Sequence, residues 1–335
     1  MSPPKSSSRQ GAGRVLVTGA GGFVGRALVA ELAARERLVR AAVRRVGPTA
    51  SSVAVAPGAQ FVQIGALASS TDWRPALDDV DSVVHCAARV HVMHEKAMDP
   101  LAEFRRANVE GTLQLARQAA EAGVRRFIFL SSIGVNGAET FDKPFDPDDV
   151  PAPHSAYALA KHEAELGLRA LSASSGLELV IIRPPLVVGP GAPGNLDRLT
   201  RALHRRLPMP FGAVDNRRSF VARANLVDLV ATCLDHPSAA GQTFLASDGE
   251  DISTTALLNA LAKALGRSAR LVPVPVAWLT AVARLAGRPQ VVQQLCGSLQ
   301  VDISKTRGLL GWSPVVRLTD ALEEVGREFL AHASR

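Results

Sequence analysis

Tyr157 and Lys161 are the two residues whose types and spacing most clearly predict chemistry. They lie four residues apart in the run SAYALAK (155–161), which has a helical composition. Residues at i and i+4 share one face of a helix, so the phenol and the ammonium can point into the same space. A nearby ammonium favours the phenolate, so we expect the pKa of Tyr157 to lie below its usual value of about 10. The pair therefore predicts a group that donates and accepts a proton.

Composition strengthens this prediction. Tyr157 is the only tyrosine of the chain, whereas phenylalanine occurs 11 times. A surface tyrosine beside a solvated lysine is the alternative, and the pair alone does not decide between the two. The decision depends on what else the chain provides for a reaction.

A glycine-rich turn near the N-terminus predicts a dinucleotide site. A β-branched strand (14–18) leads into the turn, and a helix is expected to follow over 23–34. Glycines at this spacing allow a tight turn, close approach of the backbone to a pyrophosphate, and contact between helix and strand. The helix N-terminus then faces the phosphates with its positive dipole end. The residues expected to contact the cofactor here are Gly19, Gly22, Phe23, Val24 and Gly25.

The end of the second expected strand (38–43) indicates which dinucleotide binds. A cofactor without the 2′-phosphate usually meets a carboxylate at this point. This chain has Arg44 and Arg45 instead, with no acidic residue nearby. A guanidinium matches the geometry of a phosphate, so we predict NADP(H), with NAD(H) as the alternative. Two solvated arginines on a surface turn would produce the same sequence.

Strands that alternate with helices predict an α/β fold with a doubly wound parallel sheet of the Rossmann type. Further strands are expected at 60–64, 81–88, 125–130 and 177–183, with a helix over 100–122. Ligands bind such sheets outside the carboxyl ends of the strands. Gly19, Ala87 and Ser132 lie at the ends of three strands, so we expect them to converge on one crevice.

The chain is expected to divide into three parts. A flexible tail (1–12) precedes a dinucleotide-binding domain (13–190), and a smaller mixed α/β lobe (191–221 and 248–335) follows for the substrate. A helix and a strand within 222–247 are expected to return to the first domain.

Composition excludes several functions. The formal net charge is +7, but Lys and Arg are scattered and aromatic residues make up only 4% of the chain, which argues against nucleic-acid binding. An anionic small molecule is compatible with this charge. Cys86, Cys233 and Cys296 are far apart, so we expect neither a disulfide framework nor a zinc site, and a reducing cytoplasm. The longest apolar run (271–286) is broken and too short for a bilayer, so we predict a soluble protein without a membrane span.

Three separated motifs together resemble the extended short-chain dehydrogenase/reductase family. They are the glycine turn, Ser132 at a strand end, and Tyr157-x-x-x-Lys161, in the family's order and approximate spacing. Two further segments, RPPLVVGPG (183–191) and NRRS (216–219), resemble bacterial nucleotide-sugar 4-epimerases and 4-ketoreductases of surface-polysaccharide synthesis. The resemblance covers nearly the whole chain.

The resemblance implies catalytic roles. Tyr157 would exchange a proton with the sugar at the reacting carbon while the nicotinamide exchanges a hydride. Lys161 would lower the pKa of the tyrosine and hold the nicotinamide ribose. Ser132 would hydrogen-bond the reacting oxygen, with Ser131 as the weaker candidate. Asn108 matches a position that supports the lysine, often through water, and a helix-surface amide is the alternative.

The resemblance also implies binding residues. The expected cofactor contacts are Gly19, Gly22, Phe23, Val24, Gly25, Arg44, Ala87, Asn108, Tyr157, Lys161 and Pro184. For the substrate, Asn195 and Arg218 match positions that hold the diphosphate or uridine of a UDP-sugar, with Arg217 as the alternative to Arg218. A plain surface loop is the other interpretation of each.

Two departures from the family pattern bear on the reaction. Gly65-Ala66-Leu67 stands where relatives often carry Gly-Asp-Leu, which leaves adenine recognition open, and Arg44 replaces an acidic residue. An epimerase keeps its cofactor through both half-reactions, whereas a reductase exchanges it, so an NADP-like pocket favours a reductase. We expect a UDP-N-acetylhexosamine 4-ketoreductase, with a UDP-glucose or UDP-GlcNAc 4-epimerase as the alternative. A non-catalytic dinucleotide sensor is the alternative of another class, and a homodimer is expected by analogy alone.

Two other features are expected to be inert. The segment HVMHE (91–95) has spacing that could suit a metal, but nothing else clusters with it, so we predict an ordinary loop and no metal. The apolar helix around Trp278 could touch a membrane or a partner, and we expect it to pack in the core of the smaller lobe.

Overall fold

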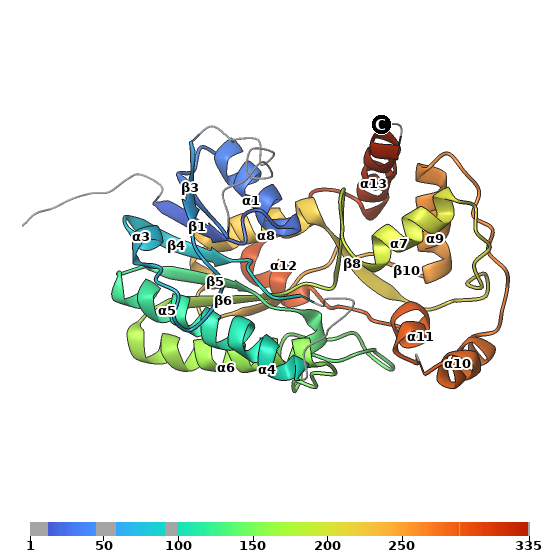
Figure 1. The fold of residues 1–335 in the computed structure, drawn as a ribbon, viewed down its shortest axis with the longest axis horizontal. Coiled ribbons are helices and arrows are strands. Elements are labelled where there is room, and N and C mark those ends of the chain that lie inside the picture. The colour runs from blue at the N-terminus through green and yellow to red at the C-terminus, as the bar shows by residue number, and fades with distance from the viewer. Residues whose placement is uncertain (1–12, 45–57, 91–98, 288, 334–335) are drawn as a thin grey trace, which may run out of the picture.

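A seven-stranded parallel sheet forms the centre of the larger domain (Figure 1). The computed structural model describes residues 13–44, 58–90, 99–287 and 289–333. The strands lie in the order β3-β2-β1-β4-β5-β6-β9. Their bounds are β1 Arg14–Thr18, β2 Val39–Val43, β3 Ala59–Gln63, β4 Val80–His85, β5 Arg126–Leu130, β6 Glu178–Arg183 and β9 Thr243–Leu245. The predicted doubly wound parallel sheet is confirmed.

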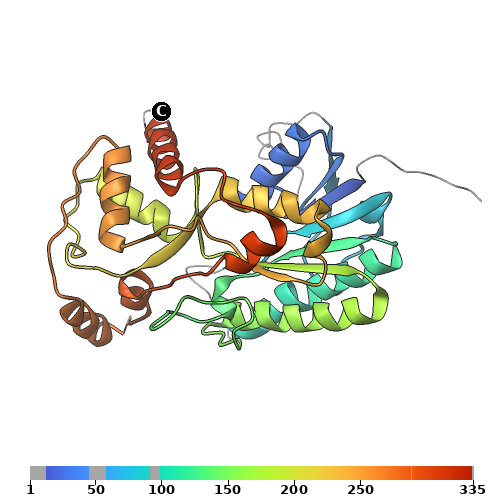
Figure 2. The ribbon, with the colours of Figure 1, turned by 180° about the vertical axis from the view of Figure 1, so that it is seen from behind.

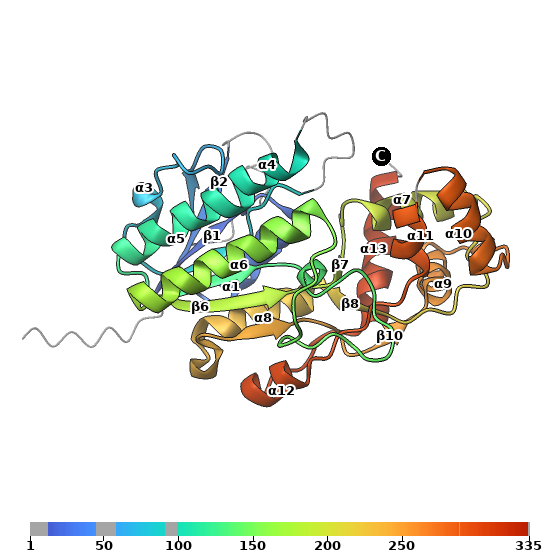
Figure 3. The same ribbon diagram turned by 90° about the horizontal axis from the view of Figure 1, so that it is seen from below.

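Helices cover both faces of this sheet, and each face has its own apolar core. Figure 3 shows α5 (Gly111–Glu121) and α6 (Ala156–Ser175) side by side on one face, where α3 (Arg74–Leu77) also packs. The opposite face carries α1 (Phe23–Ala34) and α8 (Arg223–Asp235), with α12 (Ser304–Leu310) beside them in Figure 2. Because the sheet is covered on both faces, strand β5 is buried along its whole length.

The strand order reverses between β1 and β4, which are neighbours although β2 and β3 separate them in sequence. The connections on the two sides of this point leave in opposite directions, so the carboxyl ends of β1 and β4 open a crevice. The expected helix over 100–122 is not uniform. It consists of α4 (Pro100–Phe104), a π-helical turn η1 (Arg105–Glu110) and α5.

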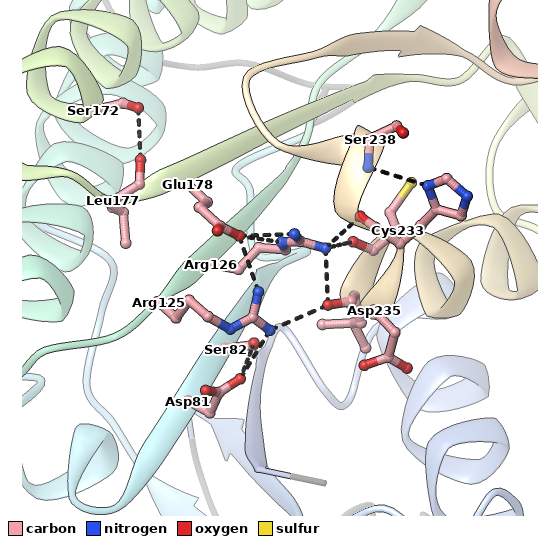
Figure 4. A network of polar contacts seen from close by, with 12 residues as sticks. Asp81, Ser82, Arg125, Arg126, Ser172, Leu177, Glu178, Cys233, Asp235 and Ser238 are labelled. Carbon is pink, nitrogen blue, oxygen red and sulfur yellow. Dashed lines mark hydrogen bonds and ion pairs between the residues drawn. The ribbon is translucent and has the colours of Figure 1, made fainter. Parts of the chain in front are cut away.

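The helix that returns to the first domain is fixed by a buried arginine (Figure 4). Nη1 of Arg126 donates to the carbonyl oxygens of Cys233, Leu234 and His236, at 2.7, 3.0 and 2.9 Å, at the C-terminus of α8. A cation at this end of a helix satisfies unpaired carbonyls and opposes the negative end of the dipole. Nε of Arg126 donates to Glu178 at 2.8 Å, so β5, β6 and α8 are held together.

A second lobe is built on a three-stranded mixed sheet in the order β10-β8-β7. Its strands are β7 (Leu186–Val188), β8 (Arg218–Ala222) and β10 (Asp251–Ile252), and its helices are α7 (Asn195–His204), α9 (Thr254–Ala264), α10 (Val276–Leu285), α11 (Pro289–Cys296) and α13 (Leu318–Ala333). Helices α7, α9 and α13 enclose a separate apolar cluster with β8. This agrees with the smaller mixed lobe predicted from the sequence.

Two details differ from the expected organisation. Leu299, Val301, Leu310 and Trp312, which the sequence-based division assigned to the substrate lobe, pack in the α1–α8 core of the first domain. The expectation that the helix around Trp278 packs in a core is wrong, because Trp278 is 70% exposed and α10 has no buried residue. Among the described residues, no helix combines the length and apolarity needed to cross a bilayer.

Candidate active site

The glycine turn between β1 and α1 requires glycine at two positions. Gly19 has a φ of +65°, and a Cβ there would lie 2.8 Å from the backbone nitrogen of Ala87. A Cβ on Gly25 would lie 2.2 Å from the carbonyl oxygen of Gly19. The turn therefore presses against both the end of β4 and its own helix, which is the close packing that the spacing predicted. Gly21, by contrast, is exposed with open space around it.

The first turn of α1 is suited to an anion. No side chain caps this helix, and its first turn contains no acidic residue. The turn folds back through a 2.8 Å hydrogen bond from the nitrogen of Gly22 to the oxygen of Gly19, so the N–H groups of Phe23, Val24 and Gly25 begin the helix at the crevice. Unpaired N–H groups at a positive dipole end fit a pyrophosphate. The residues present thus fit a dinucleotide.

The ends of β1 and β4 are joined by a buried polar network. Oγ1 of Thr18 accepts a hydrogen bond from the nitrogen of Ala87 at 3.3 Å and lies 2.7 Å from Nδ1 of His85. The other ring nitrogen of His85 lies 2.9 Å from Oγ1 of Thr112. Burial, with a smaller contribution from the charge of Lys161, lowers the pKa of His85 to about 3, so the imidazole is neutral. This network fixes Ala87 beside Gly19.

Arg44 follows β2 directly and is exposed. The backbone nitrogen of Ala20 in the glycine turn donates to Ala42 in β2 at 3.3 Å, so this strand end adjoins the turn. Arg44 is therefore on the side of the crevice where the sequence predicted it. Arg45 lies outside the described residues.

Ser132 and Ser131 have different surroundings. Ser132 is half-buried at the end of β5, and its Oγ accepts from the nitrogen of Gly134 at 3.1 Å. Ser131 is buried, and its Oγ donates to the carboxylate of Glu165. The hydroxyl of Ser131 thus bonds within the interior, whereas that of Ser132 donates to no other group in the part of the chain that the structure describes. This geometry agrees with the preference for Ser132.

Glu165 belongs to a buried ion pair that sequence reasoning missed. Arg183, at the end of β6, donates to both carboxylate oxygens of Glu165, and both side chains are at most 3% exposed. Arg183 also donates to Oδ1 of Asn136 at 3.0 Å, in the loop after Ser132. The spacing of Lys161 and Glu165, one further helical turn along α6, was the available signal. The pair holds α6, β6 and this loop in one arrangement.

Tyr157 and Lys161 share one face of α6, as predicted, and this face lies over β5. Nζ of Lys161 donates to the carbonyl oxygen of Leu130 at 2.7 Å and lies 4.4 Å from the ring centroid of Phe129. The same nitrogen lies 5.9 Å from the ring centroid of Tyr157. Since Leu130 ends β5 just before the two serines, the lysine joins the tyrosine helix to the strand that carries Ser132.

The predicted direction of the tyrosine pKa shift is wrong for this arrangement. Burial raises the pKa of Tyr157 to about 12. Although the residue is half-buried as a whole, the edge-to-face contact with Phe104, at 6.0 Å between ring centroids, restricts water on one side. Burial also lowers the pKa of Lys161 to about 8, against the opposing effects of Cys86 and Glu165. Desolvation is the largest cause of both shifts.

Asn108 lies in the π-helical turn and is buried, so the surface-amide interpretation is wrong. Its Oδ1 accepts from the nitrogen of Arg89 at 2.7 Å, and its Nδ2 donates to the oxygen of the same residue at 2.9 Å. The amide therefore holds the backbone that follows Ala87. Both hydrogen bonds go to Arg89, and neither goes to Lys161. Extra backbone turns of this kind are frequent at functional sites.

Pro184 lies next to the serines, because its carbonyl oxygen accepts from the nitrogen of Ile133 at 3.0 Å. Phe23 packs against the apolar cluster of the second lobe, and the guanidinium of Arg223, the first residue of α8, lies 5.0 Å from its ring centroid. The structure thus gathers the predicted cofactor residues along the ends of β1, β4, β5 and β6.

Asn195 and Arg218 occupy the second lobe on the other side of the crevice. Nδ2 of Asn195 donates to Gln294 at 3.3 Å, and Arg218 donates to the carbonyl oxygen of Gly297 at 2.8 Å, so both reach α11 and the residues after it. The same segment contacts the loop after Ser132, since the nitrogen of Thr140 donates to Ser298 at 2.8 Å. Both predicted substrate residues therefore bond to the segment that contacts the loop after Ser132. Arg217 is exposed.

Metal ligands do not cluster among the described residues. The segment 91–95, for which an ordinary loop was predicted, lies outside them.

Comparisons with known proteins agree with this geometry. Residues 15–246 match the model of the NAD dependent epimerase/dehydratase family. UDP-glucose 4-epimerase from Vibrio cholerae is 43% identical over 324 residues, which cover 96% of this chain and 97% of that protein.

Solved structures share the fold. UDP-glucuronic acid 4-epimerase from Bacillus cereus, in complex with NAD, has a TM-score of 0.78 at 23% identity over 95% of this chain and 99% of its own. UDP-glucose 4-epimerase from Thermotoga maritima, with UDP-glucose, has a TM-score of 0.77 at 21% identity, covering 96% and 99%. The resemblance inferred from three separated motifs is therefore confirmed. The chain belongs to the NAD dependent epimerase/dehydratase family.

Proposed function

We propose that this protein catalyses oxidation and reduction at C4 of a UDP-sugar and acts as a 4-epimerase. The observation that carries the proposal is the position of Tyr157. The only phenol of the chain lies on one helix face with a buried lysine that is bonded to the end of β5, next to Ser132. The Vibrio cholerae relative, similar over its whole length, is named for the same reaction.

Three side chains have separate roles in the proposed reaction. The Tyr157 phenolate accepts the proton of the sugar C4 hydroxyl as hydride leaves C4, and the resulting phenol returns a proton when the ketone is reduced. Ser132, whose hydroxyl hydrogen has no acceptor among the described residues, donates to the same sugar oxygen and holds it beside the phenol. Lys161, fixed by the Leu130 carbonyl, places a positive charge beneath the tyrosine ring, where it favours the phenolate while the proton is away.

A nicotinamide dinucleotide bound in the crevice supplies the hydride acceptor and donor. Its pyrophosphate would be held by the N–H groups that begin α1, and the glycine turn leaves room for it. The residues that would line the rest of the site are Arg44, Ala87, Asn108, Tyr157, Lys161 and Pro184. The Bacillus cereus enzyme contains NAD, and we assign NAD to the epimerase reaction.

Arg218 and Asn195 would hold the nucleotide part of the substrate across the crevice. Burial lowers the pKa of Arg218, so its charge is poorly solvated and an anionic diphosphate would compensate it. Asn195 begins α7, which has no side-chain cap.

A second candidate is a UDP-N-acetylhexosamine 4-ketoreductase that uses NADPH. Arg44 favours it, because an exposed guanidinium stands directly after β2, where an NAD enzyme usually has a carboxylate. The two candidates differ in their use of cofactor. A reductase consumes one reduced cofactor for each product, whereas an epimerase shows no net consumption.

The decisive experiment incubates the protein with a panel of UDP- and dTDP-sugars and each nicotinamide cofactor, with products resolved by NMR. Inversion at C4 of a UDP-sugar without net change in cofactor absorbance is expected. Stoichiometric oxidation of NADPH, with tighter binding of NADPH than of NADH, would establish the reductase instead.

Tyr157→Phe separates an enzyme from a dinucleotide sensor. The variant is expected to lose about 10²–10⁴-fold in turnover while cofactor binding is retained, because the phenol transfers the proton and the glycine turn binds the phosphates. If the unmodified protein turns over no sugar nucleotide but binds the dinucleotide, the sensor is correct.

A further inference from the structure

Helix α10 presents an apolar face to the outside of the molecule. Trp278, Val282 and Leu285 are 70%, 61% and 91% exposed, and their spacing of four and three residues places them on one side of the helix. The opposite side, with Leu279 and Ala283, is half-buried against α11. Large apolar side chains gathered in this way on a surface indicate an interaction site.

The stretch of sequence that contains this helix carries charge of one sign. The 50 residues between Asp251 and Asp302 contain no Asp or Glu, whereas they contain Lys263, Arg267, Arg270, Arg284 and Arg288. Arg284 lies on α10 itself and is exposed. An exposed arginine on the same helix as exposed Trp, Val and Leu side chains, with no acidic residue on that helix, matches the needs of an anionic lipid surface.

We propose that α10 binds to the surface of an anionic lipid bilayer, lying in the plane of the interface with Trp278, Val282 and Leu285 among the upper acyl chains. The helix has ten residues, so it is far too short to span a bilayer, and interfacial insertion needs only one apolar face. Figure 1 shows α10 at the outer edge of the second lobe, away from the central sheet, where a flat surface can reach it.

The contacts of α11 connect this surface to the crevice. Helix α11 supports α10 on one side and bonds to Asn195 and, through Gln293, to Glu139 of the first domain on the other. A bilayer that holds α10 therefore lies one helix away from the residues proposed to bind the sugar nucleotide. The interaction itself does not depend on the proposed reaction.

Tryptophan fluorescence can report binding of α10 in this test. Of its three tryptophans, Trp73 and Trp312 are buried at 3% and 5% exposure, so only Trp278 faces solvent. The protein is mixed with vesicles of phosphatidylglycerol and phosphatidylcholine, or of phosphatidylcholine alone, and both co-sedimentation and tryptophan emission are recorded. We expect sedimentation with the anionic vesicles, a blue shift, and quenching by brominated lipid.

Variants identify the surface. Val282→Glu with Leu285→Glu is expected to weaken vesicle binding by at least about 10-fold, and Arg284→Gln by about fivefold. Trp278→Phe should lose the spectral shift but still sediment. The matched control is Val315→Glu, which alters a residue that is 60% exposed beside α8 and should leave binding unchanged.

Absence of sedimentation with anionic vesicles overturns the proposal, as does equal weakening by Val315→Glu. Concentration-dependent self-association that the double variant abolishes, without any vesicle binding, would assign the face to a second copy of the chain and also overturn it. Because sedimentation requires no turnover, its outcome is independent of whether the protein proves to be an epimerase.

Discussion

Adjacent serines at the end of β5 show how a single position in a strand separates two roles. Ser131 follows the strand into the interior and meets the buried Glu165, while Ser132 turns towards the crevice. Successive side chains in an extended chain point to opposite sides, so the two hydroxyls cannot share one environment. Only one of them is available to a substrate oxygen.

Substitution of each serine by alanine should separate stability from activity. Ser132→Ala is expected to lower turnover by about 10²–10³-fold with little change in stability, because it removes a donor to the reacting oxygen. Ser131→Ala should keep turnover within a few-fold but lower the free energy of unfolding by about 1.5–3 kcal/mol, since its partner is a charged group. Steady-state kinetics and urea unfolding measure both. Equal loss of activity in the two variants would contradict the assignment.

Lys161 should make stability depend on pH in a predictable direction. Its pKa is 10.5 in the unfolded chain and falls to about 8 on burial, so between these values the unfolded state binds more protons than the folded state. The buried ammonium therefore destabilises the folded state fully below pH 8, and this destabilisation decreases as pH rises towards 10.5. The relief is worth at most about 3 kcal/mol.

Comparison with Lys161→Met isolates this effect, because other titrating groups are common to both proteins. Relative to the variant, the wild-type protein should gain stability as pH increases from 8 to 10. Chemical unfolding at a series of pH values provides the measurement. Parallel curves for the two proteins would mean that the ammonium is not desolvated.

At the scale of elements, the junction of β1 and α1 depends on the absence of side chains. The helix approaches the turn so closely that a Cβ on Gly25 would meet the Gly19 carbonyl oxygen at 2.2 Å, inside any real contact distance. The backbone would have to move, and this backbone carries the N–H groups that we propose bind the phosphates of the cofactor. Gly21 in the same turn has nothing within 4 Å and tests whether glycine is needed as such.

Gly25→Ala is therefore expected to reduce cofactor affinity by more than about 10-fold and to cost about 1–3 kcal/mol of stability through overpacking. Gly21→Ala should remain close to wild type in both. Titration of the bound cofactor by fluorescence or calorimetry, with thermal unfolding, measures the pair. A tolerant Gly25→Ala would show that α1 can withdraw from the turn.

At the scale of the whole molecule, the chain crosses between the first domain and the second lobe several times. After the second lobe it returns to the first domain through Trp312, whose indole N–H donates to Asp228 of α8 at 2.7 Å. The second carboxylate oxygen of Asp228 accepts from Arg35, which follows α1. The C-terminal segment thus closes the α1–α8 face, so the integrity of the sheet depends on residues far from the dinucleotide motif in sequence.

Substitution of two tryptophans tests whether the segment around Trp312 stabilises the α1–α8 face. Trp312→Ala should lower the free energy of unfolding by about 3–5 kcal/mol, because it empties a buried site and leaves the carboxylate of Asp228 with one partner fewer. Trp278→Ala removes the same side chain from an exposed position and should change stability by less than about 0.5 kcal/mol. Denaturant unfolding monitored by circular dichroism compares them. Similar losses in both would place α10 in a packed environment.

Local patterns in the sequence were sufficient for much of the fold. The helix over 23–34 and most strands agree with the structure to within a residue or two, because β-branched runs and glycine turns act over a few residues. The convergence of Gly19, Ala87 and Ser132 also followed, since carboxyl ends of parallel strands share one edge. The prediction that the helix around Trp278 packs in a core was wrong, because an apolar helix in the core and an apolar helix on the surface have the same sequence pattern.

The sequence by itself determined the sheet and the residues that we propose react on it: a lone phenol with a lysine one helical turn away, and a glycine turn after the first strand. Only the tertiary structure decided their environment. The pKa of Tyr157 rises because burial acts on it from residues distant in sequence, and Glu165 meets Ser131 and Arg183 only when α6 packs on the sheet. Desolvation and ion pairing depend on what surrounds a side chain in space, which the spacing of residues along the chain does not specify.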